Sequence, residues 1–342
     1  MKTFRNQGWL QWTLCLSCTV FLTPACGDEL DETAGIEATE QEDVQALSSW
    51  DPGRGPAFLK LVRQLNADGS GSREEASHLQ HTCVGNRTGQ HQYGNAYRIS
   101  CTGPGGEKKS GLLFLFIGTQ SWQEFCAQGV SLTQSYFRFP WQPQGDTTLV
   151  ATLLNWTNRL ASVSDFVVAQ TKAYRATSGT AVQDPVIFAG HSKGGIVAQL
   201  FGFARASIET DTGFDGPFHQ RYTTVISFNA PKPSQRNDVA ALYKSTAYST
   251  VRRYKPVWIE RANDVIPRLP TSWPARSKNQ FSRYRTKPAA DLHHHRLYQY
   301  TDQEMVDAAN ALQLDPWGGK PRQGFFGEAD DNHTCSDPGD EL

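Results

Sequence analysis

Apolar residues follow two patterns along this chain of 342 residues. Helical spacing over residues 56–65 predicts a helix whose apolar face is formed by Phe58, Leu61, Val62 and Leu65. Residues 78–84 and 93–101 alternate instead, as extended segments do. A continuous apolar run over residues 112–117 then follows between Gly111 and Gly118. Such an uninterrupted run between glycines indicates a strand buried on both faces, as parallel sheets require.

Helices and strands alternate in the rest of the chain. The pattern predicts helices over 147–174, 194–205 and 238–244, and strands over 186–189, 223–228 and 251–259. This alternation implies right-handed crossovers between parallel strands. We therefore predict an α/β fold with a mostly parallel central sheet and helices on both of its faces.

The composition is that of a folded protein. Hydrophobic residues make up 38% of the chain, and 18 Phe, 11 Tyr and 9 Trp supply the apolar surface of a large core. The length suits one large domain or two ordinary ones, and we expect folding without a metal ion. With 33 Lys and Arg against 34 Asp and Glu, the net charge of −1 argues against nucleic-acid binding, which needs a basic excess.

Residues 1–25 have the form of an export signal. Lys2 and Arg5 precede an uncharged run that ends in Thr23-Pro24-Ala25-Cys26, and this run is too polar for a comfortable membrane span. Its last four residues resemble a bacterial lipoprotein box, in which Cys26 becomes the lipidated first residue of the mature chain. Plain signal-peptidase cleavage near Ala25 is the alternative. Both alternatives predict an exported protein, either a cell-envelope lipoprotein or a secreted one.

Charge is distributed unevenly after the signal. Residues 27–53 hold nine acids and no Lys or Arg, so we interpret 26–54 as an extended acidic tether. Without those nine acids, Lys2 and Arg5, 31 basic and 25 acidic residues remain, a net charge of +6. We assign 55–327 to the folded domain and 328–342 to an acidic tail. Eleven basic residues between Arg252 and Arg296 predict attraction to an anionic surface such as phospholipid, with a solvated basic face as the alternative.

Four cysteines remain in the exported chain once Cys15, Cys18 and Cys26 are set aside: Cys83, Cys101, Cys126 and Cys335. An even number in an exported protein favours two disulfides, for which there are three pairings. Cys83 and Cys101 flank two alternating segments that would form a hairpin, so we prefer a Cys83–Cys101 bridge, which leaves Cys126–Cys335 as the second. The four cysteines show no zinc-site spacing.

The pentapeptide Gly190-His191-Ser192-Lys193-Gly194 lies directly between a predicted strand and a predicted helix. In that context Gly-x-Ser-x-Gly is the nucleophile elbow of serine hydrolases. The turn is tight, so the residues two before and two after the serine have to be small. We expect the Ser192 hydroxyl to stand free at the tip of the sheet, with the backbone N–H of Lys193 ready to bind an oxyanion. The alternative is a glycine-rich turn in which Ser192 only caps the helix.

A serine nucleophile needs a base and an orienting carboxylate, which follow it in the order Ser, Asp, His. Asp264 comes just after the predicted strand 251–259 and is the preferred acid, with an Asn-Asp turn as the alternative. Asp211, Asp215 and Asp238 occupy ordinary loop or cap positions. The histidines that follow are His293, His294, His295 and His333. We favour His295, because Leu297 and Tyr298 would pack a helical turn beneath it, and place His294 second.

Several segments together resemble the class 3, or fungal-type, lipase family: Gly190–Gly195, the strand end 116–119, the segment 263–270 and the run 295–298. The resemblance covers residues 112–300, in the order of the family. It implies an α/β-hydrolase-like fold and a Ser192–His295–Asp264 triad. It further implies an oxyanion hole formed by Thr119 and Lys193, and a lid or acyl-binding segment with Tyr136, Phe137, Phe139 and Trp141. Ile117 and Lys193 differ from the residues that are common at those positions in the family. The separation between Asp264 and His295 is also shorter than in the fungal enzymes.

The residues and the resemblance together predict a serine hydrolase that cleaves carboxylic esters of lipids, as a lipase, esterase or phospholipase. Such an acyl-enzyme mechanism needs no metal or organic cofactor. We expect a lipid or ester substrate, met at a membrane or lipid interface, and no nucleic-acid or obligate protein partner. Two other functions fit the same residues: a catalytically silent surface lipoprotein that binds a hydrophobic ligand or partner, and a serine peptidase.

Overall fold

The computed structural model of the chain describes residues 50–68, 72–118, 134–137, 150–177, 184–208, 223–231, 254–262, 264, 266–268, 282–288, 300–318, 321–322 and 324–328. The predicted export signal, the predicted tether up to residue 49, the predicted helix 238–244 and the predicted tail from residue 329 lie outside these residues. Within them, no helix is both long and apolar enough to cross a membrane.

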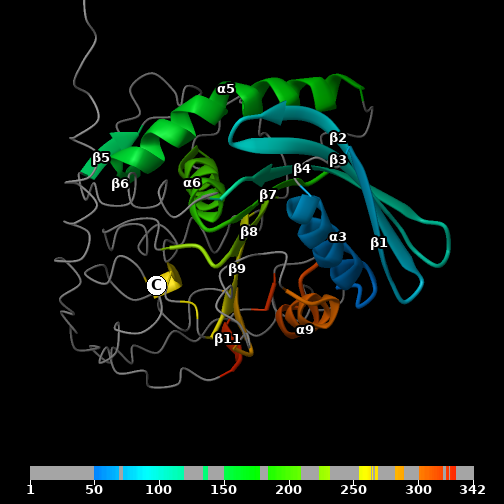
Figure 1. Cartoon of the computed structure of the whole chain (residues 1–342). Helices are drawn as coiled ribbons and strands as arrows, with labels where there is room; N and C mark the ends of the chain where they lie inside the picture. The colour runs from blue at the N-terminus through cyan, green and yellow to red at the C-terminus, as the bar shows by residue number, and fades with distance from the viewer. Residues whose placement is uncertain are drawn as a thin grey trace, which may run out of the picture.

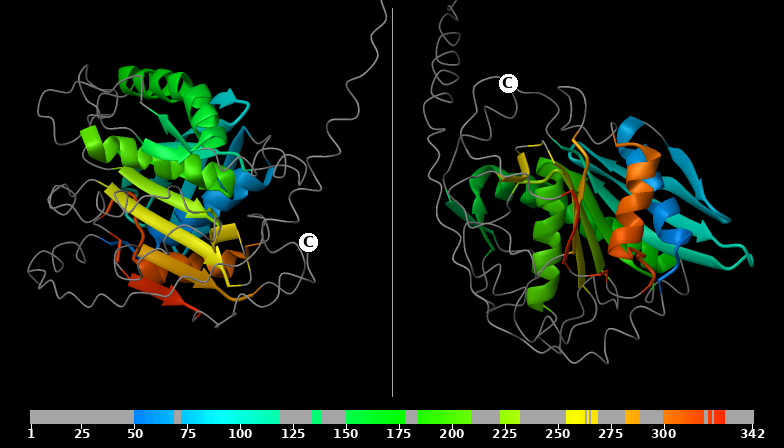
Figure 2. Two further views of the ribbon diagram at one scale, coloured as in Figure 1. Left: turned by 90° about the vertical axis from the view of Figure 1, so that its left-hand side faces the viewer. Right: turned by 90° about the horizontal axis from the view of Figure 1, so that it is seen from below.

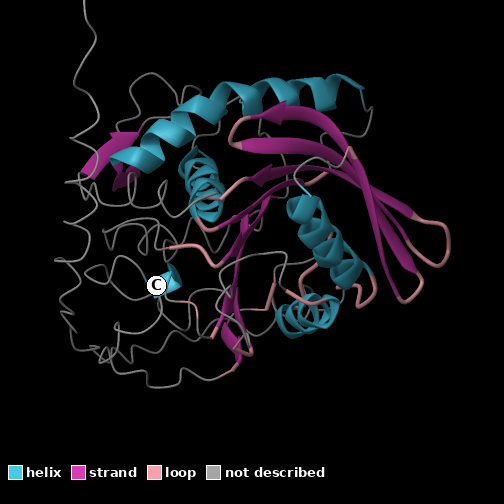
Figure 3. Cartoon of the chain, viewed as in Figure 1, coloured by secondary structure: helices cyan, strands magenta, loops and turns pink. Residues whose placement is uncertain are grey.

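A nine-stranded mixed sheet is at the centre of the described fold, in the order β1-β2-β3-β4-β7-β8-β9-β10-β11 (Figures 1 and 3). The first four strands form an antiparallel meander: β1 (Arg73–His78), β2 (His81–His91), β3 (Gly94–Thr102) and β4 (Lys108–Phe116). From β4 onward all neighbours are parallel: β7 (Val186–His191), β8 (Thr223–Phe228), β9 (Tyr254–Arg261), β10 (Ser282–Thr286) and β11 (Gly324–Gly327). A separate antiparallel pair consists of β5 (Gln134–Phe137) and β6 (Val150–Leu153).

Helices cover both faces of the sheet, as the views in Figures 1 and 2 show. The apolar cluster on one face includes residues of α5 (Leu154–Thr177) and α6 (Lys193–Ile208). The cluster on the other face includes residues of α3 (Arg54–Asp68) and α9 (Asp302–Leu312). The arrangement is therefore an α/β fold with a mostly parallel sheet, as predicted. It continues into a four-stranded antiparallel meander, of which only the hairpin of β2 and β3 was predicted.

Strand β4 explains why residues 112–117 read as an uninterrupted apolar run. Leu113 and Leu115 belong to the core under α3 and α9, whereas Leu112, Phe114 and Phe116 belong to the core under α5 and α6. Successive side chains of a strand point to opposite faces, so a strand covered on both faces needs apolar residues at every position. The predicted burial on both faces is confirmed.

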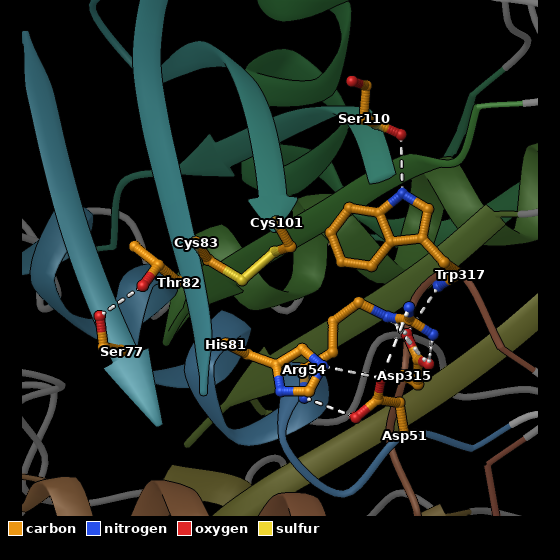
Figure 4. Close-up of a disulfide and its surroundings, with 10 residues drawn as sticks. All are labelled: Asp51, Arg54, Ser77, His81, Thr82, Cys83, Cys101, Ser110, Asp315 and Trp317. Carbon is orange, nitrogen blue, oxygen red and sulfur yellow. Dashed lines mark hydrogen bonds and ion pairs between the residues drawn. A yellow bond between two sulfur atoms is a disulfide. The ribbon is translucent and has the colours of Figure 1, made fainter. Parts of the chain in front are cut away.

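A disulfide joins Cys83 of β2 to Cys101 of β3, as predicted (Figure 4). The two cysteines are register partners in the antiparallel pair, and both are buried. The second predicted bridge, Cys126–Cys335, lies outside the described residues.

The folded part begins earlier than the predicted boundary at residue 55. Asp51 accepts hydrogen bonds from the backbone N–H groups of Gly53 (2.9 Å) and Arg54 (3.1 Å) at the start of α3. Its other carboxylate oxygen lies 2.9 Å from Nε2 of His81, at the start of β2 (Figure 4). Arg54 in turn pairs with Asp315 in the loop after α9. One acid counted with the tether therefore belongs to the body.

Some element boundaries differ from the sequence patterns. The predicted extended run 78–84 is interrupted by the turn at Leu79, which separates β1 from β2. Residues 150–153, predicted as the start of a long helix, form β6 instead. Strands β10 and β11 and helix α9 had no counterpart among the predicted elements. Helix α9 nevertheless has a local signal, a capping box in which Thr301 and Glu304 bond to each other's backbone N–H groups.

Candidate active site at the carboxyl edge of the sheet

Ser192 is the single residue between strand β7 and helix α6, and its backbone is left-handed with φ of 53°. That conformation costs a non-glycine residue about 1–3 kcal/mol, and residues held in it cluster at functional sites. The strand, the serine and the helix therefore follow one another in the order that a nucleophile elbow requires.

Two glycines of the pentapeptide are required by close backbone packing. A Cβ atom at Gly190 would lie closer than 3.0 Å to the carbonyl group of Gly194. A Cβ atom at Gly194 would lie equally close to the carbonyl group of Phe116, at the end of β4. The backbone of the elbow thus fits against itself and against the neighbouring strand only if both positions are glycine.

Backbone hydrogen bonds hold Ser192 in place. Its N–H donates to the carbonyl of Phe228, the last residue of β8, at 2.9 Å. Its own carbonyl accepts the N–H groups of Gly195 (2.9 Å) and Ile196 (3.3 Å) in the first turn of α6. Ser192 thus lies at the N-terminus of that helix, where the helix dipole and the outward-pointing N–H groups stabilise negative charge. Lys193, as the first helical residue, supplies one of those N–H groups.

The end of β4 lies against the elbow. A Cβ atom at Gly118 would come within 3.3 Å of the Ser192 Cβ and 3.0 Å of the His191 Nδ1. The preceding residue, Ile117, is fixed because its N–H donates to the carbonyl of Tyr93 at 3.0 Å. This bond fixes the chain directly after the end of β4. Thr119, the predicted second oxyanion donor, is the next residue and lies outside the described part of the chain.

The exposure of Ser192 differs from the prediction. We expected a free hydroxyl at the tip of the sheet, but Ser192 is only 1% exposed to solvent. A tight turn exposes a serine only if no other part of the chain covers it, and the pattern around the pentapeptide holds no information about such cover. An ester can reach Ser192 only from a conformation more open than this one.

Asp264 follows β9 and is 3% exposed. Its N–H donates to the carbonyl of Arg261 (3.2 Å), and its Oδ1 accepts the N–H of Ile266 (2.9 Å), which opens a short 3-10 helix, η2 (Ile266–Arg268). The turn that we considered as an alternative role is therefore present. It does not exclude the catalytic role, because a carboxylate has two oxygens and can accept several hydrogen bonds.

The topology brings Ser192 and Asp264 to one edge of the sheet. Strands β7, β8 and β9 are parallel neighbours, with His191, Phe228 and Ile259 in register at their carboxyl ends. Ser192 follows the first of these strands and Asp264 the third. We call this end of the parallel strands the carboxyl edge, which is where ligands bind in open α/β sheets.

Six further predicted site residues lie outside the described residues. This holds for His293, His294, His295, Phe139, Trp141 and Cys26. Tyr136 and Phe137 belong by their backbone to strand β5, which pairs with β6, so the segment predicted as an aromatic loop is partly a strand.

One residue at the carboxyl edge was not predicted. Asn229 follows β8, is fully buried and has a left-handed backbone with φ of 45°. Its Oδ1 accepts two hydrogen bonds, from the N–H of Arg261 (2.9 Å) and from the hydroxyl of Tyr300 (2.8 Å). An asparagine after a strand is a weak local signal, because Asn is common in turns.

The basic run 252–296 contains arginines that serve the folded body. Arg261 forms an ion pair with Glu304 (3.2 Å), and Arg283 forms one with Glu260 (2.6 Å). Arg283 and Arg285 also lie over the ring of Phe325, at 5.2 and 5.0 Å. These three side chains are therefore not part of a solvated basic face.

A second cluster of polar side chains lies around the start of α3, and Figure 4 shows its members Asp51 and His81. One ligand atom from each of Asp51, His81 and Glu107 lies within 4.8 Å of the others. The guanidinium of Arg54 lies 3.7 Å from the same Asp51 oxygen that contacts His81. Because the oxygens of Asp51 are already engaged by the N–H groups of Gly53 and Arg54 and by His81, we do not assign a metal site to the cluster.

Comparison with known proteins adds little to this description. No protein-family model matches the chain, and no curated protein matches it. A crystal structure of M37 lipase is similar to the chain with 14% sequence identity and a TM-score of 0.35, over 83% of this chain and 73% of that lipase. We draw no conclusion about fold or activity from a similarity of this degree.

Proposed function

We propose that the protein is a serine hydrolase that cleaves carboxylic esters, with Ser192 as the nucleophile. The observation that carries the proposal is the left-handed Ser192 between β7 and α6, packed on glycines that tolerate no side chain. A serine that only capped α6 would have the extended backbone of an ordinary helix cap and would not need glycine on both sides. The strained geometry therefore favours a nucleophile elbow over a cap.

The proposed reaction has two steps. The Ser192 Oγ attacks the ester carbonyl while a histidine takes the hydroxyl proton, and the oxyanion is stabilised by N–H groups at the start of α6, including that of Lys193. The carbon–oxygen bond of the ester breaks, and the alcohol leaves with the proton from the histidine. Water then adds to the acyl-enzyme by the same proton relay, which releases the carboxylate and restores the serine. We assign Asp264 to orient the histidine and His295 to carry the proton, with Thr119 as the second oxyanion donor.

We further propose that the substrate is a lipid ester and that the protein is a bacterial exported member of the class 3 lipase type. The support is the resemblance of the elbow, the Asp264 segment and the residues after it, together with the apolar and aromatic segment that contains Tyr136 and Phe137. The amino-terminal signal supports export, as a lipoprotein or as a secreted enzyme. Comparing hydrolysis of a water-soluble short ester, phospholipid vesicles and a peptide substrate separates esterase, phospholipase and peptidase.

The decisive experiment is covalent labelling with a fluorophosphonate probe, which reacts with activated serines. The wild-type chain should be labelled and should hydrolyse a short p-nitrophenyl ester, whereas Ser192→Ala should lose both properties and remain folded. Ser164→Ala is a matched control, because Ser164 is a buried serine whose hydroxyl donates to the Leu160 carbonyl inside α5. This variant should keep both properties.

The burial of Ser192 makes the labelling test a demanding one. Reaction requires that the enclosed serine become accessible, so the assay includes detergent micelles and vesicles as well as buffer. If the wild-type chain stays unlabelled in all three media, the esterase proposal is wrong and a ligand-binding surface protein remains. Labelling that persists in Ser192→Ala would equally refute the assignment.

A further inference from the structure

Two residues with left-handed backbone, Ser192 and Asn229, lie at the carboxyl edge. Among the described residues, four that are not glycine have positive φ: Leu79, Ser192, Asn229 and Gln313. Leu79 lies in the turn between β1 and β2, and Gln313 is the C-cap of α9, so local structure accounts for both. Ser192 is accounted for by the elbow. Asn229 lies in the bend that directly follows β8, and Asn adopts left-handed backbone more readily than most residues.

Asn229 joins three segments of the chain: the end of β8, the end of β9 and the segment that enters α9. Its backbone N–H donates to the carbonyl of Ile259 in β9 (3.0 Å). Its Oδ1 accepts the backbone N–H of Arg261, 32 residues away, and the hydroxyl of Tyr300, 71 residues away. Both bonds are buried, where a lost hydrogen bond is costly because water cannot replace the partner.

Each of these three segments leads to a proposed member of the active site. Phe228, which precedes Asn229, accepts the N–H of Ser192. The carbonyl of Arg261 accepts the N–H of Asp264. Tyr300 follows in sequence the run that contains His293, His294 and His295. A shift of the Asn229 side chain would therefore be transmitted to the nucleophile, to the acid and to the chain that leads to the base.

Tyr300 is itself held firmly, so its bond to Asn229 fixes one segment to another. Its ring packs edge-on against Phe228 with centroids 6.1 Å apart. The guanidinium of Arg261 lies over the ring at 4.4 Å and pairs with Glu304 of α9. Complete burial raises the pKa of Tyr300 well above its ordinary value, so the hydroxyl remains a donor throughout the working pH range.

We propose that Asn229 is a positioning residue of the active site. Its side-chain oxygen keeps the Ser192 turn, the Asp264 loop and the segment entering α9 in a single arrangement, and its left-handed backbone aims the oxygen at both donors. The proposal rests on the proposed esterase function, and the residue acts through its neighbours rather than on the substrate. Misplacing catalytic groups by 1 Å costs on the order of 100-fold in rate, which sets the size of the expected effect.

Three variants test the role of the oxygen. Asn229→Asp keeps an acceptor of the same shape, Asn229→Gly keeps the backbone conformation without the acceptor, and Tyr300→Phe removes one donor while retaining the ring. We expect kcat for a short p-nitrophenyl ester to fall about 10-fold to 100-fold in Asn229→Gly and Tyr300→Phe, with KM nearly unchanged. The acidic limb of the kcat/KM profile should shift in the same two variants, because the histidine is held less well by its carboxylate. Asn229→Asp should restore most of the rate.

Tyr174→Phe is the matched control for a lost tyrosine hydrogen bond. The Tyr174 side chain is buried, and its hydroxyl donates to Asp184 at 2.7 Å, just before the start of β7 at the opposite end of the strand from Ser192. This variant should lose thermal stability and keep kcat and the pH profile. A purely structural role of Tyr300 would give the same result as this control.

The outcomes are separable from those of the esterase test. If the wild-type chain is labelled and hydrolyses the ester, but folded Tyr300→Phe and Asn229→Gly keep its kcat and pH profile, the positioning role is refuted and the function stands. The role is also refuted if Asn229→Asp is folded and as slow as Asn229→Gly. Should Asn229→Gly not fold, as judged by circular dichroism and thermal unfolding, the comparison of Tyr300→Phe, Asn229→Asp and Tyr174→Phe decides.

Discussion

The glycines around Ser192 allow a close approach that no other residue permits. Gly194 lies against the carbonyl of Phe116, and these are backbone atoms of a buried strand that cannot move aside. This close packing places the start of helix α6 directly behind the serine. The pentapeptide is recognisable in the sequence because its own residues are local, whereas the contact that excludes a side chain at Gly194 comes from Phe116 in β4.

Substituting Gly194 by alanine should disturb both stability and reactivity. The new Cβ would overlap the end of β4, which we expect to lower the free energy of unfolding by about 1–3 kcal/mol and to slow fluorophosphonate labelling of Ser192. Urea unfolding and the labelling rate measure the two effects. Gly105→Ala is the control, because its Cβ would meet only the flexible carboxylate of Glu107. Equal behaviour of the two variants would contradict the packing argument.

How far the sequence predicts a residue depends on where its partners are. The elbow could be predicted because Gly190, Ser192 and Gly194 lie within five residues. The role of Asn229 could not, because its two donors are 32 and 71 residues away and no pattern in the sequence links them. The burial of Ser192 was not predicted either, because the residues of the pentapeptide do not determine how exposed its serine is.

At the scale of elements, strength of pattern decided which predictions succeeded. Strand β4 was predicted because it is buried on both faces and is therefore apolar at every position. Strand β8 was predicted because it continues a regular alternation of strands and helices. Strands β10 and β11 are short, and β10 has Arg283 and Arg285, whose charges are satisfied by Glu260 and by the face of Phe325. Strand β10 was therefore missed because its sequence is polar, and the residues that pair with its arginines are distant in sequence.

The start of α3 allows a pH test at this scale. Burial by itself would raise the pKa of Asp51, but hydrogen bonds from Gly53 and Arg54 and the charge of Arg54 outweigh it, so the pKa lies below its ordinary value of 3.8. A lowered pKa stabilises the folded state above 3.8, and this contribution disappears as the pH falls through the folded-state value.

Asn has a side-chain oxygen like that of Asp, so Asp51→Asn removes the charge and keeps an acceptor for the N–H groups of Gly53 and Arg54. We expect the variant to be less stable than the wild type at pH 7, with the difference shrinking as the pH falls below 3.8. Urea unfolding of both proteins across this range measures the difference. A difference that stays constant down to the lowest pH would show that the Asp51 charge contributes nothing.

At the scale of the whole molecule, the sheet combines two architectures. Strands β1 to β4 are adjacent in sequence as well as in space, whereas β7 to β11 are separated by long crossovers. The patterns predicted β7, β8 and β9 of the crossover half, because alternating helices and strands define a parallel sheet, but they missed β10 and β11. They did not reveal that the sheet continues through an antiparallel meander, since alternating polar strands fit several topologies.

This division has a consequence for how the chain acquires its structure. Contacts between sequence neighbours form faster than contacts that close long loops, so the meander should assemble first. Pulse-labelling hydrogen exchange during refolding with the disulfide intact should show amides of β2 and β3 protected before those of β8 and β9. Simultaneous protection of all four strands would contradict this order.

If the order holds, β4 serves as a template. The half of the sheet that forms first would present an edge on which β7, and with it the turn at Ser192, is added. The candidate active site would then form last, only after the antiparallel meander has become rigid.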